Sequence, residues 1–321
     1  MLQATASADQ YVGGMPLETV QTGMISGDLY IDATVPSFGQ TDVAKKFAIP
    51  AYTQIRWARL YVVVYCGHMQ NNYNGTATVS LDANGDGVYE AVLGTEDLDV
   101  PFTYVADGGT GYVLVNGHTT RVSSDYLMWY DVTSRIISRN PGVRVETSRI
   151  NPSFDGRIKA VTLVVAYDDG DSDQVWFAVN QGHDADTYYS DDWLGEDYWG
   201  ETSFDPSGLS ESMEKATLTV NHLASQDGSY LFDGEDLAGS QHQGAYFGYN
   251  SWDVTDVVDP DGSNDLFYDR ADQFYKIILA TLTIRQGVEP EETPDDEEYP
   301  DEGGSTTTDS GSQFSDVAVE E

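Results

Sequence analysis

The residues best suited to metal chemistry lie in one short acidic segment, DANGDGVYE, residues 82–90. Oxygen-bearing side chains take alternate positions in it and a glycine permits a sharp turn, as at the start of an acidic calcium loop. The candidate ligands for calcium or another divalent cation are Asp82, Asn84, Asp86 and Glu90. An EF-hand would place a bidentate glutamate at the twelfth position, which is Leu93 here, and Asp-Gly is also a strong hairpin signal. A plain turn is therefore the alternative to a cation site.

A second group of candidate ligands lies in the segment QGHDADTYYSDDWLGEDYWGE, residues 181–201. Histidine and carboxylate side chains can hold a cation, and aromatic rings offer flat faces on which sugars can stack. The candidate ligand-binding residues are His183, Asp184, Asp186, Trp193 and Trp199. The alternative interpretation is a long solvated loop with a few aromatic anchors.

The sequence offers no pattern typical of catalysis. The five histidines do not cluster with a serine or cysteine, and GxSxG, HExxH and P-loop lysine motifs are missing. Acidic pairs can form a glycosidase dyad, but 54 Asp and Glu residues make chance pairs expected. We therefore expect a protein that is not an enzyme and requires no cofactor, with a hydrolase as the residual alternative. The sequon NGT makes Asn74 a candidate glycosylation site.

The charge balance restricts the partners. Fifteen Lys and Arg residues against 54 Asp and Glu residues give a net charge of −39. Such a surface repels nucleic-acid phosphates and anionic lipid headgroups and attracts cations, so we expect no nucleic-acid partner. The apolar runs are strand-sized, which predicts no transmembrane segment. The single cysteine, Cys66, lies in the apolar run YVVVYCG, and we expect it to be a buried small hydrophobe.

The N-terminus carries a weak export signal. Ala6-Ser7-Ala8 fits the small-residue pattern of a signal-peptidase site, with Asp9 as the mature start. A chance match is the alternative, because no apolar region precedes the triplet. Together with the acidity and the lack of disulfides, the pattern favours an extracellular or cell-surface protein with residues 1–8 as a signal-peptide remnant.

Short strand signals recur along the chain. They are rich in β-branched and aromatic residues and are bounded by Gly, Asp, Asn and Pro, as in QIRWARLYVVVYC, RIKAVTLVVAY and QFYKIILATLTI. No segment keeps an apolar stripe of helical period. The pattern predicts an all-β fold with the strand spacing of a sandwich or jelly roll.

Four landmarks recur in the same order and indicate an internal duplication. They are a strand ending in Gly-His at His68 and His183, a TxTV…DGxY block at 76–89 and 217–230, an Asp-Val-Thr phrase within 129–137 and 251–259, and an apolar closing strand. The second TxTV block has Leu223 where the first has Asp82, so a calcium site would belong to the first copy alone. Because Asp and Thr bond nearby amides, we interpret the Asp-Val-Thr phrases as structural corners.

The duplication predicts two tandem β-sandwich, jelly-roll-like units, over residues 9–170 and 171–288. The boundary is placed near the polar segment YDDGDSDQ. Residues 289–321 are acidic and then rich in Gly, Ser and Thr, so they lack the apolar surface needed to offset ordering. We expect that last segment to be a disordered tail.

Several segments resemble a family of uncharacterised surface proteins of methanogenic archaea. The matching features are YVGGMPL…SGDLYIDA, WARLYVVVYCGHM, the paired Asp-Val-Thr phrases and FYKIILATLTIRQ, which together cover roughly residues 11–287. The resemblance implies a secreted or envelope-attached β-protein with no catalytic residues to transfer. It also suggests a specific role, the major protein of the tubular sheath around some filamentous methanogens.

These observations predict a structural protein of the archaeal cell envelope, in a sheath or surface layer. It would associate with itself, and with other envelope glycoproteins, through strand edges or sandwich faces. The alternative function is a secreted carbohydrate-binding or adhesion module.

Overall fold

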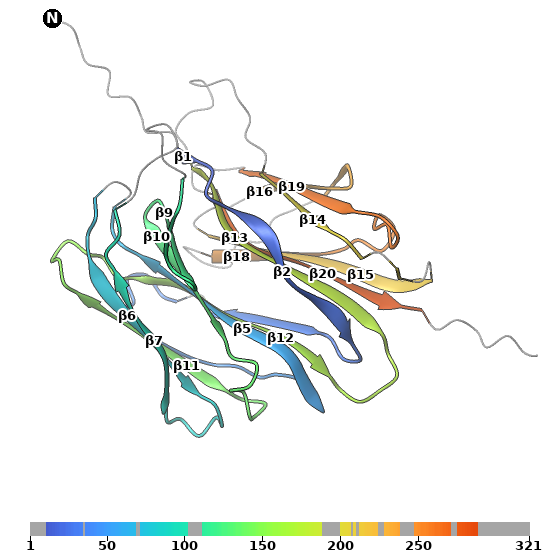
Figure 1. The fold of residues 1–321 in the computed structure, drawn as a ribbon, viewed down its shortest axis with the longest axis horizontal. Helices are drawn as coiled ribbons and strands as arrows, with labels where there is room; N and C mark the ends of the chain where they lie inside the picture. Colours follow the sequence, from blue (N-terminus) through green and yellow to red (C-terminus); the bar gives the residue numbers. More distant parts are fainter. Residues whose placement is uncertain are drawn as a thin grey trace, which may run out of the picture. The chain divides into compact units, whose positions relative to one another are not determined.

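The structure is a computed structural model that describes residues 11–34, 36–68, 71–101, 111–187, 200–206, 208–209, 212–223, 228–237, 247–270 and 275–287. Every regular element in these ranges is a β-strand, which confirms the all-β prediction (Figure 1). The described strands belong to one compact unit that ends at Gly287. The expected signal-peptide remnant and the expected tail lie outside the described residues. Within those described ranges, no helix is long and apolar enough to cross a lipid bilayer.

Two antiparallel sheets form the first half of the fold. The sheet that we call the first inner sheet has the order β3 (Leu29–Thr34), β12 (Ile158–Asp168), β5 (Gln54–Tyr65), β10 (Asp125–Asp131), β9 (Thr119–Val122) and β8 (Val113–Asn116). The first outer sheet has the order β4 (Asp42–Lys46), β11 (Gly142–Arg149), β6 (Gly75–Asp82) and β7 (Ala91–Leu98).

Two further antiparallel sheets form the second half. The second inner sheet contains β1 (Tyr11–Val12), β13 (Val175–Thr187), β20 (Tyr275–Gln286), β15 (Met213–Leu223) and β18 (Phe247–Asp253), with β2 (Met15–Ile25) also paired to β13. The second outer sheet has the order β14 (Gly200–Phe204), β19 (Asn264–Arg270), β16 (Gly228–Phe232) and β17 (Glu235–Asp236).

Three apolar cores hold the four sheets in layers. One core lies between the first outer and first inner sheets, a second between the second inner and second outer sheets, and a third between the two inner sheets. Strand β5 shows why its sequence reads as an unbroken apolar run. Leu60 and Val62 face the first core while Tyr61 and Val63 face the third, so both faces of the strand are buried.

The strand order of the two halves is the same, which supports the predicted duplication. In the inner sheets, β3, β12, β5 and β10 correspond in order to β13, β20, β15 and β18. In the outer sheets, β4, β11, β6 and β7 correspond to β14, β19, β16 and β17. Among the described strands, β8 and β9 have no counterpart in the second half.

The two Asp-Val-Thr phrases form matching corners after β10 and β18. The amide of Val132 donates to the carbonyl of Ala58, and that of Val254 donates to the carbonyl of Ala216, both at 3.0 Å. The Ala58 amide donates in return to the hydroxyl of Thr133 at 2.9 Å. In the second copy, the Ala216 amide donates to Thr255 Oγ1 at the same distance. The phrases are structural corners, as predicted.

Two of the four landmarks do not mark equivalent strands. The first TxTV block begins on β6, whereas the second begins on β15, which corresponds to β5. Likewise, His68 follows β5, but His183 lies in β13, the counterpart of β3. These alignments were wrong because a strand with one face on a core alternates Thr with Ala, Val or Leu wherever it sits. The comparison of Asp82 with Leu223 therefore does not hold.

The N-terminal strands join the second half. Strand β2 pairs with β13 from Met15 to Ile25, and β1 pairs with the far end of β13. The range 9–170 predicted for the first sandwich thus contains two strands that extend the inner sheet of the other sandwich.

Candidate functional site

The Asp82 loop connects β6 to β7 and is organised by its own side chains. Asp82 is buried, and its Oδ1 accepts the amides of Gly85 at 2.7 Å and Asp86 at 3.2 Å. Its Oδ2 accepts the Gly87 amide at 2.7 Å. Gly85 and Gly87 both have positive φ, a conformation that other residues adopt only at a cost. The Asp-Gly therefore serves a tight turn, as the alternative interpretation expected.

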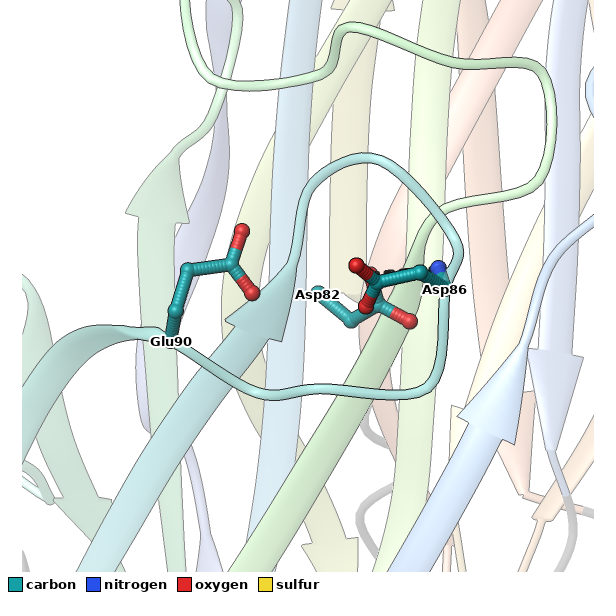
Figure 2. A group of neighbouring side chains, drawn as sticks. All are labelled: Asp82, Asp86 and Glu90. Atoms are coloured by element: carbon teal, nitrogen blue, oxygen red, sulfur yellow. Dashed lines mark hydrogen bonds between the residues drawn. The ribbon is translucent and has the colours of Figure 1, made fainter.

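Three of the four predicted calcium ligands also come together in this loop. One carboxylate oxygen from each of Asp82, Asp86 and Glu90 lies within 4.8 Å of the others, with Glu90 on the opposite arm of the loop (Figure 2). Asn84, the fourth, is bonded within the loop instead. Its Nδ2 donates to Asp86 Oδ2 at 3.0 Å, and its Oδ1 accepts the Asp86 amide. Hard oxygen ligands at this spacing suit calcium, and calcium binding remains a prediction.

The segment 181–201 does not form one solvated loop. Its described parts are the first two residues of β14, Gly200 and Glu201, and the end of β13, where His183 and Asp184 are both buried. Asp186 lies in the same strand, and Trp193 and Trp199 are outside the described residues. The solvated-loop interpretation fails for residues 181–185 because the strand continues between two packed sheets.

His183 and Asp184 have separate surroundings. Asp184 Oδ2 accepts the hydroxyl of Tyr268, on β19 of the second outer sheet, at 2.8 Å. His183 interacts electrostatically with Lys276 and Asp125 instead. Burial, together with the Lys276 charge, lowers the pKa of His183 to about 3. Neither ring nitrogen of His183 has a hydrogen-bond partner among the described residues. A cation held jointly by these two residues does not fit this arrangement.

Asn74, the candidate glycosylation site, immediately precedes β6 and is half-buried. Its carbonyl accepts the amides of Ile150 at 3.2 Å and Asn151 at 2.9 Å. The backbone of Asn74 therefore anchors the turn after β11, and glycosylation of its side chain stays a prediction.

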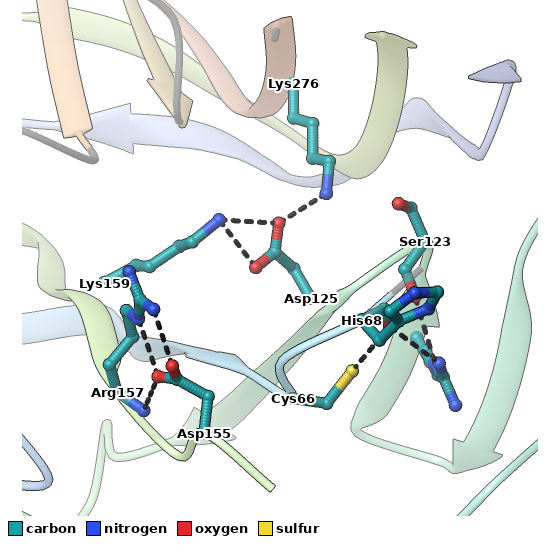
Figure 3. Close-up of polar contacts among 9 residues, drawn as sticks. Cys66, His68, Ser123, Asp125, Asp155, Arg157, Lys159 and Lys276 are labelled. Carbon is teal, nitrogen blue, oxygen red and sulfur yellow. Dashed lines mark hydrogen bonds and ion pairs between the residues drawn. The ribbon is translucent and has the colours of Figure 1, made fainter. Parts of the chain in front are cut away.

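The sequence interpretation missed a buried ionic cluster between the two inner sheets. Asp125 on β10 contacts Lys159 on β12 at 2.7 Å and also contacts Lys276 on β20 (Figure 3). All three side chains are buried. Burial alone would raise the pKa of Asp125, but the two ammonium groups outweigh it and hold that pKa below its usual value. The cluster thus joins the two halves through opposite charges.

A signal for this cluster was present in the sequence. Lys159 and Lys276 each stand at the second position of a closing strand, directly before a mostly apolar run. A lysine buried at such a position must find a counter-ion, since an unpaired buried charge is very costly. The identity of the partner, Asp125, was not readable because it lies on a strand distant in sequence from both.

Glu96 on β7 is another buried carboxylate, and both of its oxygens are bonded. It accepts hydrogen bonds from Asn116 at 2.7 Å and Tyr130 at 3.0 Å, and it pairs with His118 Nε2 at 2.8 Å. Burial opposes ionisation here, but these contacts prevail and lower the pKa of Glu96. Asp125 and Glu96 therefore both stabilise the fold as ionised groups.

The whole described fold corresponds to one protein family. Residues 10–285 match the family described as "Protein of unknown function (DUF3344)". The match runs from the residue before β1 to the second-last residue of β20. The chain belongs to this family. No curated protein matches the chain.

Some solved structures share a distant likeness. PNGase F, a glycosylasparaginase from Flavobacterium meningosepticum, has 10% identity and a TM-score of 0.28, over 83% of this chain and 96% of its own. A Streptomyces avermitilis α-L-rhamnosidase has 13% identity and a TM-score of 0.22, over 88% of this chain and 30% of its own. TM-scores this low assign neither an activity nor a ligand to the chain.

Proposed function

We propose that this protein is a non-enzymatic structural component of an archaeal cell envelope, in a sheath or surface layer, whose copies associate through strand edges. The observation that carries the proposal is the edge strand β7. It has eight residues and, among the described strands, pairs only with β6. An edge strand presents unpaired backbone amides and carbonyls that a second chain can extend.

The other edges of the outer sheets are less suited to pairing. Strands β4 and β14 have five residues each, and β17 has two. Strand β4 also carries Lys45 and Lys46, and charged lysines are a common means of blocking edge pairing. Strand β7 contains no lysine or proline, and Val92 on it is 57% exposed. We therefore assign the contact between copies to β7.

A lysine introduced on this edge tests the assignment. Val92→Lys should abolish assembly while changing the free energy of unfolding by less than about 0.5 kcal/mol, since the side chain is exposed. The matched control is Ile150→Lys, because Ile150 is 59% exposed but lies in the turn after β11. Sedimentation velocity and electron microscopy of both variants at high salt give the readout.

Assembly of Val92→Lys to the same extent as the wild type would remove β7 from the interface. Wild-type protein that stays monomeric in all salts would contradict the structural role itself. The carbohydrate-binding alternative was predicted at Trp193 and Trp199, outside the described residues, so those aromatics give it no structural support.

A further inference from the structure

A groove of about 450 Å³ lies between the edge strand β3 of the first inner sheet and the face formed by β15, β18 and β20 of the second. Its rim is open to solvent, since Asp28, Lys215 and Ser251 on it are exposed. The volume falls within the range of about 300–1,000 Å³ usual for small-molecule sites. It exceeds the share of one water, about 30 Å³, many times over.

The two walls of the groove differ in chemistry. Strand β3 contributes aliphatic surface through Leu29, Ile31 and Ala33, which also pack against the core between the inner sheets. The opposite wall presents hydroxyl groups, from Thr217, Thr219, Ser251, Thr281 and Thr283. A hydroxyl both donates and accepts hydrogen bonds. The groove therefore offers an apolar side and a side that can bond to other hydroxyls.

Strand pairing fixes the hydroxyl wall as a regular array. Thr217 is paired with Thr283, and Thr219 with Thr281. On the other side, Thr219 is paired with Ser251, and their hydroxyl oxygens are 3.1 Å apart. Hydroxyls held on neighbouring strands repeat at about 4.8 Å, without the entropy cost of ordering mobile side chains.

Asn221 lies at the inner end of the groove and is 0% exposed. Neither its Oδ1 nor its Nδ2 has a hydrogen-bond partner among the described residues. The next residue on this face of β15, Leu223, belongs to the apolar core between the inner sheets. A buried amide without partners is costly for folding and calls for an explanation. Two neighbouring ligand hydroxyls, one donating to Oδ1 and one accepting from Nδ2, would satisfy both polar atoms of Asn221.

We propose that this groove binds a neutral saccharide. A sugar has hydroxyls at its edge and C–H groups on its faces, which matches one hydroxyl wall and one aliphatic wall. Tyr249, 40% exposed at the rim, supplies an aromatic face for a further sugar ring. The net charge of −39 repels anionic ligands. Of the charged residues that line the groove, Asp28 and Lys215 are of opposite sign, and Asp32 is paired with Lys45 at 2.9 Å. This inference does not depend on assembly through β7.

Titration calorimetry on the unassembled protein at low salt tests the proposal. The probes are the neutral tetrasaccharides maltotetraose, cellotetraose, chitotetraose and mannotetraose, with tetragalacturonate as the anionic comparison. We expect binding of at least one neutral probe and none of tetragalacturonate. Asn221→Leu should weaken that binding about tenfold or more, because it removes the amide and keeps the volume. Tyr249→Ala should also weaken it without affecting the fold.

The melting temperature separates a ligand-facing Asn221 from a structural one. Asn221→Leu should raise it by about 2 °C, since it replaces an unpartnered buried amide. The control is Asn180→Leu on the same sheet, where the amide is bonded to Thr19, Thr202 and the carbonyl of Ser203. That control should lower the melting temperature and leave binding unchanged.

Three results would overturn the proposal. The first is failure of all four neutral tetrasaccharides to bind the wild type. The second is unchanged affinity in both Asn221→Leu and Tyr249→Ala. The third is a fall in melting temperature for Asn221→Leu equal to that of Asn180→Leu, which would make Asn221 a structural residue. None of these results depends on whether copies assemble.

Discussion

At the scale of single residues, two positive charges are buried between the inner sheets against one negative charge. One carboxylate, Asp125, faces two ammonium groups, Lys159 and Lys276. Burial of ion pairs is costly, and removing one partner is more so because the other charge is left uncompensated. The neighbouring His183 escapes this cost by remaining neutral, as its lowered pKa shows.

His183 gives the protein a specific dependence on pH. Its pKa is about 3 in the folded state against an ordinary value of 6.5, so the unfolded chain takes up the proton first. Stability is therefore lost as pH falls from about 6.5 towards 3. Between pH 7 and pH 5 the expected loss is about 2 kcal/mol, measured by urea unfolding at each pH.

The control is His183→Phe, which fills the site without titrating. The difference in unfolding free energy between wild type and variant should change by this amount across the same range. A difference that is constant from pH 7 to pH 5 would show that His183 does not remain neutral in the fold. Asp125 affects stability at lower pH. Because its pKa is depressed in the folded state, the stability that its ionised form provides is lost only as pH falls below the unfolded value of about 4.

At the scale of elements, the two corners carry the repeated architecture. Thr133 and Thr255 each accept the amide of a buried alanine on the neighbouring strand. Thr133→Val and Thr255→Val leave those amides without a partner, so each should reduce the unfolding free energy by about 1–3 kcal/mol in urea titrations.

Thr78→Val is the matched control for the corners. Its hydroxyl meets that of Thr95 on an exposed surface at 3.2 Å, and its loss should change stability by less than about 0.5 kcal/mol. Equal effects at the corners and at Thr78 would contradict the structural role given to the Asp-Val-Thr phrases.

Sequence pattern predicts strands and corners well and strand partners poorly. The corner phrase is readable because Asp and Thr bond within a few residues, which is local chemistry. Period-two alternation in TATVSL and TLTVNHL reports one buried face, and it carries no information on which sheet that face covers. The same limit hid the pairing of β2 with β13 and the meeting of Asp125 with Lys276.

The candidate sites show the same division. The acidic loop at Asp82 was predictable, because its residues are close along the chain. The groove was not, since Leu29, Asn221 and Thr281 come from three strands on two sheets. In the sequence, the groove is signalled only by Asn221, a polar amide that follows the alternating residues of TLTV on the strand.

At the scale of the whole molecule, a net charge of −39 opposes close approach of copies. Charges on different copies are screened only when the Debye length is short, about 10 Å at 0.1 M salt and about 3 Å at 1 M. The proposed assembly should therefore increase with sodium chloride in sedimentation velocity experiments. Assembly that persists in a chelator at low ionic strength would contradict cation-screened packing.

Calcium distinguishes general screening from a specific site in the same experiment. At matched ionic strength, calcium chloride should promote assembly more than sodium chloride if the Asp82 loop holds the ion. Asp86→Asn, at an exposed ligand of that loop, should then remove the calcium excess and leave the sodium response intact. An identical calcium response in this variant would reject the loop as the site.

The crossing of β2 into the second half has a consequence for how the chain is made. Thr19 on β2 bonds Asn180 on β13, 161 residues later. At about 5–20 residues per second, β2 leaves the ribosome roughly 8–30 s before its partner is synthesised. During that interval the strands of the first sandwich, β3 to β12, can pair, but β1 and β2 have no partner until β13 is made. Strand β2 is therefore made before every strand of the first sandwich, yet it can take its place in the inner layer only after β13 has been made.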